Sequence, residues 1–222
     1  MSKRDSSQTG KSDSSQSSLK LLEVGTITAL LVPLLYTAGW SFAYHYFEHF
    51  YLGLIGLDIP KEYLFQYSLW VLKDQIPLSL AGLIIAVSVW FIADFCFATP
   101  EKPKSKLWQT IGLIIIPVLI LSLFALLYYM GDAAGKSVYE KQAKSDFPSY
   151  PSVKVWLTEE ARKEVRIAPK LEDGCYRLLL RNKDFLYLFS PSKYTEKIPT
   201  EIISSDKVRM IRVLPFYHSC KD

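Results

Sequence analysis

The sequence predicts an α-helical integral membrane protein, with three transmembrane helices and a small C-terminal α+β domain. Three apolar segments carry this prediction, because a membrane-spanning helix needs about 20 mostly apolar residues. They are Val24 to Tyr44, Ile76 to Phe97 and Leu107 to Met130. The chain after them is polar, with short alternating stretches that are typical of strands. We therefore divide it into a tail (residues 1–20), a three-span region (21–131) and a soluble domain (132–222).

The composition agrees with this division, because the mean hydropathy of +0.12 averages two unlike halves. Aromatic residues gather beside the apolar segments, as in the interfacial belts of membrane proteins. The formal net charge is +4, but the basic residues form no compact stripe and no known binding motif. We therefore expect a lipid bilayer as a partner and no nucleic acid.

The N-terminal tail is rich in serine, glutamine and lysine and has almost nothing apolar to bury, so we expect disorder. The apolar segment that follows is longer than the core of a cleaved signal peptide, which has about 7–15 residues. The one plausible cleavage site, before Gly39, has Tyr36 where a small residue is needed. The first segment therefore reads as an uncleaved signal-anchor.

The positions of the basic residues predict an orientation. Lysine and arginine keep short loops in the cytoplasm. They occur in the tail (Lys3, Arg4, Lys11 and Lys20) and in the link between the second and third segments (Lys102, Lys104 and Lys106). Three crossings then place the N-terminus in the cytoplasm and the C-terminal domain outside, and a bacterial inner membrane is the preferred setting.

The predicted outer loop Glu48–Gln75 contains two further elements. Pro60 suits the first turn of a helix, so we expect a helix over 61–72 that lies in the membrane interface or packs over the bundle. The apolar stretch 51–57 is too short to span a membrane. A re-entrant segment is an alternative interpretation of it.

The string His45-Tyr46-Phe47-Glu48-His49 matches the inverted zinc-protease signature. On a helix His45 and His49 fall on one face, close enough to share a metal, with Glu48 as a general base. The main interpretation is different: the string lies among aromatic residues at a membrane exit, where histidine acts as an amphipathic belt residue. No cofactor is expected on that interpretation.

Three further sets of residues are candidate sites. Asp94 is an acid inside an apolar segment, which favours an ion or proton role or a pairing with the nearby lysines. Gly131 and Gly135 match the small-xxx-small pattern that lets helices approach closely. Cys175 and Cys220 form a candidate disulfide if the outer compartment is oxidising, and closing that loop stabilises by about 3–4 kcal/mol.

The C-terminal domain shows a short strand over Val153 to Leu157 and a helix capped by Thr158. Two stronger strands, Cys175 to Leu180 and Phe185 to Ser190, flank a turn, and Val208 to Leu214 adds another strand. No Ser/His/Asp set, carboxylate pair or glycine-rich loop is found there.

The sequence therefore favours a non-enzymatic membrane protein: a sensor, an anchor or an accessory subunit that binds a protein partner or itself through its outer domain. One alternative is a homo-oligomeric channel or transport component, suggested by Pro33, Pro117 and Asp94. Another is a membrane metal-dependent hydrolase that uses His45, Glu48 and His49.

Overall fold

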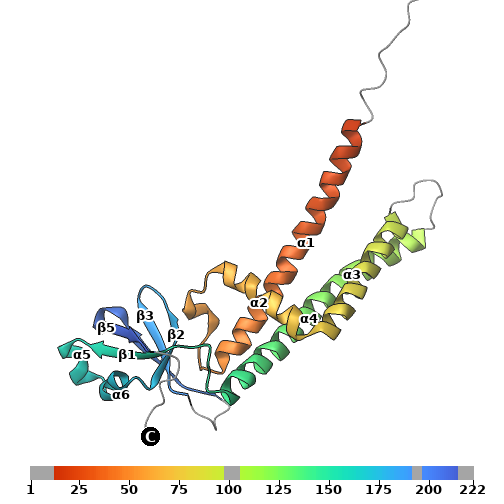
Figure 1. Ribbon diagram of the computed structural model, residues 1–222. Helices are drawn as coiled ribbons and strands as arrows, with labels where there is room; N and C mark the ends of the chain where they lie inside the picture. The colour runs from red at the N-terminus through yellow and green to blue at the C-terminus, as the bar shows by residue number, and fades with distance from the viewer. Residues whose placement is uncertain (1–12, 98–105, 192–196, 215–222) are drawn as a thin grey trace, which may run out of the picture.

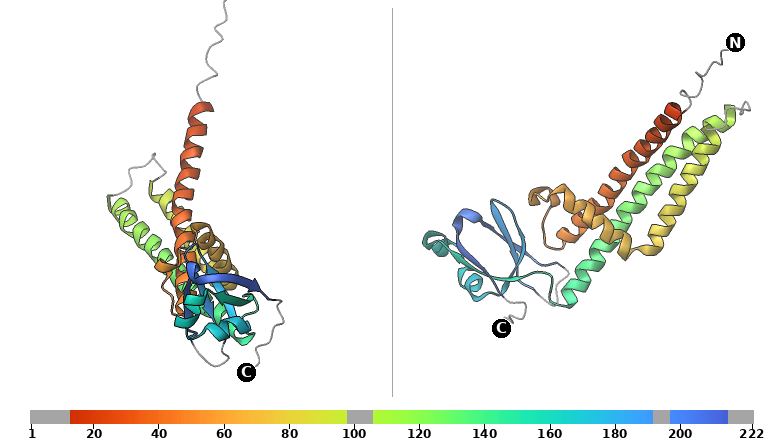
Figure 2. Two further views of the ribbon diagram at one scale, coloured as in Figure 1. Left: turned by 90° about the vertical axis from the view of Figure 1, so that its left-hand side faces the viewer. Right: turned by 45° about the horizontal axis from the view of Figure 1, so that its top comes forward.

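The computed structural model describes residues 13–97, 106–191 and 197–214, and within these the side chains of 28–89, 91–92, 113–191 and 197–214. This part contains six α-helices and a five-stranded antiparallel sheet. The four longer helices form an elongated bundle, and the sheet with two short helices lies at one end of it (Figures 1 and 2).

The bundle is built around its last helix. It contains α1 (Asp13–Glu48), the short 3-10 helix η1 (Leu54–Leu57), α2 (Lys61–Asp74), α3 (Ile76–Phe97) and α4 (Lys106–Lys144). Helix α4 contacts α1 and α3 and also touches α2. Helix α1 begins inside the range predicted as a tail, while residues 1–12 of that tail lie outside the described residues.

Helices α2 and α3 meet at a sharp corner of 103°. The Ser79 hydroxyl donates to the carbonyls of Leu72 (3.1 Å) and Gln75 (3.0 Å), which ties the two helices together where the chain bends. Lys141 of α4 pairs with Asp74 at 2.7 Å and fixes the corner to the bundle. The helix expected over 61–72 is confirmed as α2.

The prediction of three membrane-spanning helices is wrong. Within the described residues one helix, Leu113–Lys144, is long and apolar enough to cross a membrane. The predicted second span passes the same test only as a bent pair, α2 with the first part of α3. In the predicted first span, Ala38, Phe42 and Ala43 are at most 1% exposed and pack in the protein core. Hydropathy along a sequence does not distinguish side chains that face lipid from side chains that face other helices.

The sheet follows α4. Its elements are β1 (Ser152–Leu157), α5 (Glu159–Glu164), α6 (Ala168–Asp173), β2 (Tyr176–Arg181), β3 (Phe185–Phe189), β4 (Thr200–Ser204), the 3-10 helix η2 (Ser205–Lys207) and β5 (Val208–Val213). The strand order is β4-β3-β2-β1-β5, with every neighbouring pair antiparallel. Strands β4 and β5 are therefore the edges.

The four strands expected from the sequence are present as β1, β2, β3 and β5, while β4 was not predicted. The cap at Thr158 is also present, because its side-chain oxygen accepts from the Ala161 amide at 3.4 Å.

The two faces of the sheet join different cores. Val153, Val155, Leu186 and Leu188 face the short helices α5 and α6 with Leu171 and Ala168. On the opposite face Leu179, Tyr187 and Phe189 belong to the core of the helical bundle. Strand β3 is thus buried on both sides, because its alternate side chains point to opposite faces. The sheet is anchored to the helices through β2 and β3.

Candidate functional site

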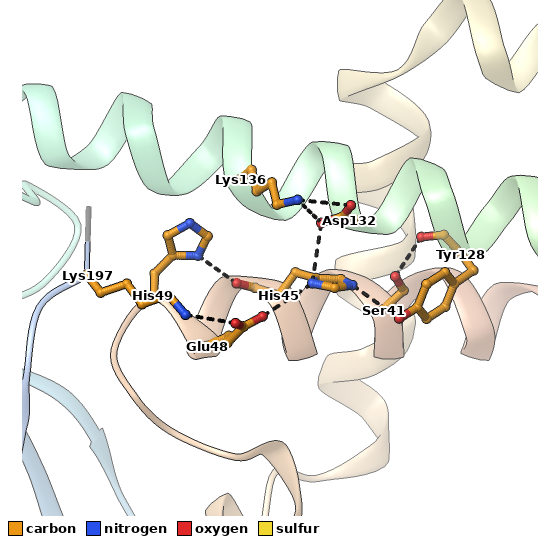
Figure 3. Close-up of polar contacts among 8 residues, drawn as sticks. All are labelled: Ser41, His45, Glu48, His49, Tyr128, Asp132, Lys136 and Lys197. Carbon is orange, nitrogen blue, oxygen red and sulfur yellow. Dashed lines mark hydrogen bonds and ion pairs between the residues drawn. The ribbon is translucent and has the colours of Figure 1, made fainter.

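Charged and polar side chains gather between α1 and α4, near the end of the bundle that meets the sheet (Figure 3). The His45 Nδ1 atom lies 3.3 Å from Asp132 Oδ1 and 3.6 Å from Glu48 Oε2. Its Nε2 atom lies 3.3 Å from the Tyr128 hydroxyl. Lys136 pairs with Asp132 at 2.9 Å. We call these five residues the α1–α4 polar cluster.

The spacing of residues on each helix creates this cluster. Tyr128, Asp132 and Lys136 follow one another at intervals of four and therefore share one face of α4. Ser41 and His45 have the same spacing on α1, and the Ser41 hydroxyl donates to the Tyr128 carbonyl at 2.6 Å. The polar face of α1 therefore packs against the polar face of α4.

Glycines on α4 permit the close contact of the two helices. A Cβ atom at Gly131 would lie 2.7 Å from the Ala38 carbonyl oxygen and 2.6 Å from Ser41 Cβ. At Gly135 it would lie 2.9 Å from the Phe42 carbonyl oxygen. Both glycines therefore face α1 at positions where any side chain would collide with backbone.

The cluster extends to the sheet domain through Glu48. Lys197, which lies between β3 and β4, pairs with Glu48 at 2.8 Å and also lies 5.7 Å above the ring of Tyr51. The hydrogen bond from Lys197 holds the pKa of Glu48 below its ordinary value of 4.5. Glu48 therefore stays charged across the neutral range and links α1 to the loop before β4.

An aromatic cluster lies beside the polar one and joins three parts of the chain. Phe50 is fully buried, with ring centroids 5.0 Å from Phe189, 5.4 Å from Tyr139 and 5.7 Å from Phe147. The residues of this aromatic junction come from the end of α1, from α4, from the turn after it and from β3: Tyr46, Phe50, Tyr139, Phe147, Tyr150 and Phe189. Aromatic pairs at such separations contribute about 0.5–1.5 kcal/mol each beyond burial.

The polar atoms of the aromatic junction are mostly paired. The hydroxyls of Tyr46 and Tyr150 lie 2.8 Å apart, and burial raises the pKa of both, so both remain protonated and able to share a hydrogen bond. Arg177 donates to the Tyr150 carbonyl at 2.7 Å. Phe147 has a φ of 52°, a costly backbone conformation for a bulky residue. Its burial holds it in that conformation, and the chain turns from α4 toward β1 there.

Two more hydrogen bonds tie the sheet domain to the loop after α1. The Ile198 amide donates to the His49 carbonyl at 2.8 Å, and the Tyr187 hydroxyl donates to the Gly56 carbonyl at 3.1 Å. The stretch 51–57, considered above as a re-entrant segment, thus lies against the sheet. The helices and the sheet are thus joined by backbone hydrogen bonds, by the ion pair of Lys197 with Glu48 and by the aromatic junction.

The two histidines of the H-x-x-E-H string contact different residues of α4. His45 lies against Tyr128 and Asp132. The His49 ring stacks on Tyr139 at 4.2 Å, and its Nδ1 atom lies 2.7 Å from the His45 carbonyl oxygen (Figure 3). No group of three or more metal-ligating His, Cys, Asp or Glu side chains occurs in the described part of the chain. The string serves to connect α1 to its neighbours.

The other predicted site residues are placed as follows. Asp94 lies within α3, but its side chain is outside the described residues. Cys175 is half-buried before β2, and Cys220 lies outside the described residues, so their pairing stays a prediction. Sequence reasoning missed Asp132 and Lys197. The four-residue spacing of Tyr128, Asp132 and Lys136 was a usable signal for the first, whereas nothing local points to Lys197.

No protein-family model, no curated protein and no solved structure matches this chain.

Proposed function

We propose that the protein is a membrane-anchored, non-enzymatic accessory or sensor subunit, held in the bilayer by α4 with α3 beside it. One observation carries the proposal. Large aliphatic side chains on these two helices are exposed, including Ile84 (67%), Leu113 (70%) and Leu121 (67%). On the same two helices, Leu80, Leu83, Val87 and Val118 are 44–60% exposed.

Large exposed apolar side chains in this number are rare on soluble monomers and indicate contact with lipid or protein. In the apolar stretch of α4, with a mean hydropathy of 2.6, only 17% is buried within the protein. Each exposed leucine or isoleucine gains about 1 kcal/mol or more on leaving water. Lipid is the partner that fits a helix that is apolar around most of its circumference.

The distribution of charge supports one orientation. The link between α3 and α4 contains Lys102 and Lys104, and a short loop rich in lysine favours the cytoplasmic side. The sheet lies at the other end of α4 and would then be extracytoplasmic, as in a bacterial inner-membrane protein (Figure 1).

The contacts between the sheet and the helices support the proposed role as a subunit. The aromatic junction fixes the sheet to the helices through buried contacts, and the partly exposed pair of Lys197 and Glu48 adds a second link. Force or a partner acting on the sheet would then reach α1 and α4 directly. The charged groups of the cluster are engaged with one another, which suits a structural coupling.

The test compares two lysine substitutions at similarly exposed apolar residues. Leu121→Lys places a charge in the proposed lipid face, at a cost of about 2.5–3.5 kcal/mol near a helix centre. Ile202→Lys, at a residue 53% exposed on β4, places the same charge in water. We expect Leu121→Lys to reduce the carbonate-resistant membrane fraction of the full chain, with Ile202→Lys unchanged. A wild-type chain found in the soluble fraction, or equal behaviour of the two variants, would refute the anchor.

A further inference from the structure

The bundle covers only part of the inner face of the sheet. It covers this face at β2 and β3, through Leu179, Tyr187 and Phe189. Farther along the same face, β1 and β5 present Lys154 and Trp156 opposite Arg212 and Met210. We call these four residues the β1–β5 face.

The register establishes which way these side chains point. Val153 and Val155 are fully buried beside α5 and α6, with Ile211 packed against that core. Side chains alternate along a strand, so Lys154 and Trp156 on β1 and Met210 and Arg212 on β5 lie on the opposite face. Met210 is 52% exposed and Arg212 is exposed as well.

The charges on this face are unbalanced. Lys154 and Arg212 are direct cross-strand partners, an arrangement that destabilises an antiparallel pair because like charges face each other. Neither makes an ion pair with another described residue, whereas nearby Lys207 pairs with Glu164 at 3.2 Å. Arg209 adds a third exposed cation at the bulge opposite Trp156 and Leu157. An anionic group beside Arg212, on the outer side of β5, would offset this repulsion.

The edge of β5 supplies hydrogen-bonding groups beside these cations. The Leu214 amide donates to the Ser152 carbonyl at 2.8 Å, so Leu214 and, two residues back, Arg212 point their backbone groups at β1. Ile211 and Val213 therefore point their N–H and C=O groups outward, and β5 is the last strand of the sheet. An edge of this kind can accept one more strand.

We propose that the β1–β5 face and the outer edge of β5, which pairs with no other described strand, bind an extended acidic segment of a partner protein by strand addition. The added strand pairs with the outward backbone groups of Ile211 and Val213. A carboxylate then lies beside Arg212, and two residues along the partner strand an apolar side chain lies beside Met210 and Trp156. The cations select the partner, because they repel strands that carry basic residues at the same position.

This inference deepens the proposed function, since it rests on the sheet domain as the partner-binding part of the subunit and names the class of partner. Nucleic acid is a less suitable occupant, because few cations lie on this face and they sit next to a strand edge that a nucleic acid cannot pair with. Anionic lipid likewise makes no use of the outward backbone groups.

The binding test uses the full chain in detergent and a capped eight-residue peptide of valine and leucine that carries two glutamates, each two positions from a central leucine. A matched peptide has lysines in place of the glutamates. We expect the acidic peptide to bind and the basic peptide not to bind. Arg212→Glu should weaken the acidic peptide by about tenfold or more, because attraction becomes repulsion, and should allow the basic peptide to bind.

Two further variants separate the contributions of charge and backbone. Val213→Pro removes an outward N–H group without removing a bond to β1, so it should also weaken the acidic peptide. Arg181→Glu changes the same charge at an exposed residue at the end of β2 and should leave binding unchanged. Circular dichroism of each variant shows that the fold is intact.

Several results would overturn the inference: equal binding of both peptides, binding unaffected by Arg212→Glu, or binding of single-stranded RNA or anionic vesicles in place of the peptide. Concentration-dependent self-association that Arg212→Glu abolishes, with no peptide binding, would assign the face to a second copy and also overturn it. None of these outcomes changes the membrane fractionation of Leu121→Lys, so failure here is distinguishable from failure of the anchor.

Discussion

Replacing Gly131 with alanine tests whether α1 and α4 are in direct backbone contact. In an open helix position the change stabilises by about 0.5–1 kcal/mol, because glycine is the more flexible residue in the unfolded chain. At Gly131 the new Cβ atom would lie 2.7 Å from the Ala38 carbonyl oxygen and 2.6 Å from Ser41 Cβ. The first of these is backbone and cannot rotate away.

The helices must therefore separate. Overpacking of this kind costs about 1–3 kcal/mol. The separation also strains the hydrogen bond from the Ser41 hydroxyl to the Tyr128 carbonyl, worth about 1 kcal/mol. After the gain in helix propensity is subtracted, we expect a net loss of about 2 kcal/mol.

Gly82 provides the matched control on α3. A Cβ atom there would lie 3.5 Å from Leu126 Cδ2 and 3.7 Å from Leu123 Cδ1, which are ordinary contacts. Gly82→Ala should therefore be neutral or stabilising by up to about 1 kcal/mol. Thermal unfolding of both variants in the same detergent, followed by circular dichroism, measures the difference. A Gly131→Ala protein as stable as the wild type would refute the close packing of α1 on α4.

Two further predictions concern the junction. The pKa of Glu48 is held below its ordinary value of 4.5, so the pair with Lys197 stabilises the fold above that value and is lost as the pH falls through the lowered pKa. Lys197→Gln should remove this part of the pH dependence of the unfolding free energy, measured between pH 7 and about pH 3. The effect should be at most about 1 kcal/mol, because Glu48 is 46% exposed. An unchanged acid transition would contradict the pairing. Phe50→Ala should destabilise the protein by about 3–5 kcal/mol in urea unfolding, whereas Phe185→Ala, at a residue 40% exposed, should cost far less. Equal losses would show that the aromatic junction does not join the two parts.

Local patterns in the sequence predicted much of the sheet and little of its pairing. The alternation in β1, the apolar run of β3, the turn between β2 and β3 and the cap at Thr158 depend on neighbouring residues and could be predicted. The placement of β5 beside β1 joins residues more than 50 positions apart, such as Val153 and Val213, and no short-range pattern encodes it. Strand β4 was missed because Thr200–Ser204 mixes polar and apolar residues without regular alternation.

The candidate site, like the sheet, could be predicted only where it depends on the spacing of neighbouring residues. The four-residue spacing that brings Tyr128, Asp132 and Lys136 to one face of α4 can be read from the sequence. The contact between Glu48 and Lys197 joins positions 149 apart and depends on the folded junction. The count of membrane spans failed for a related reason, because Phe42 is as apolar as a lipid-facing residue but packs against Tyr67 and Tyr46.

The most direct test of the membrane anchor is cysteine labelling in intact bacterial spheroplasts, in a chain whose own cysteines are replaced by serine. Lys183→Cys introduces a thiol at an exposed residue in the turn between β2 and β3, and Lys104→Cys introduces one in the link between α3 and α4. The account predicts that a membrane-impermeant maleimide labels position 183 before lysis and position 104 only after lysis, both in the membrane fraction. Labelling of both only after lysis, or recovery of the protein as a soluble species, would contradict it.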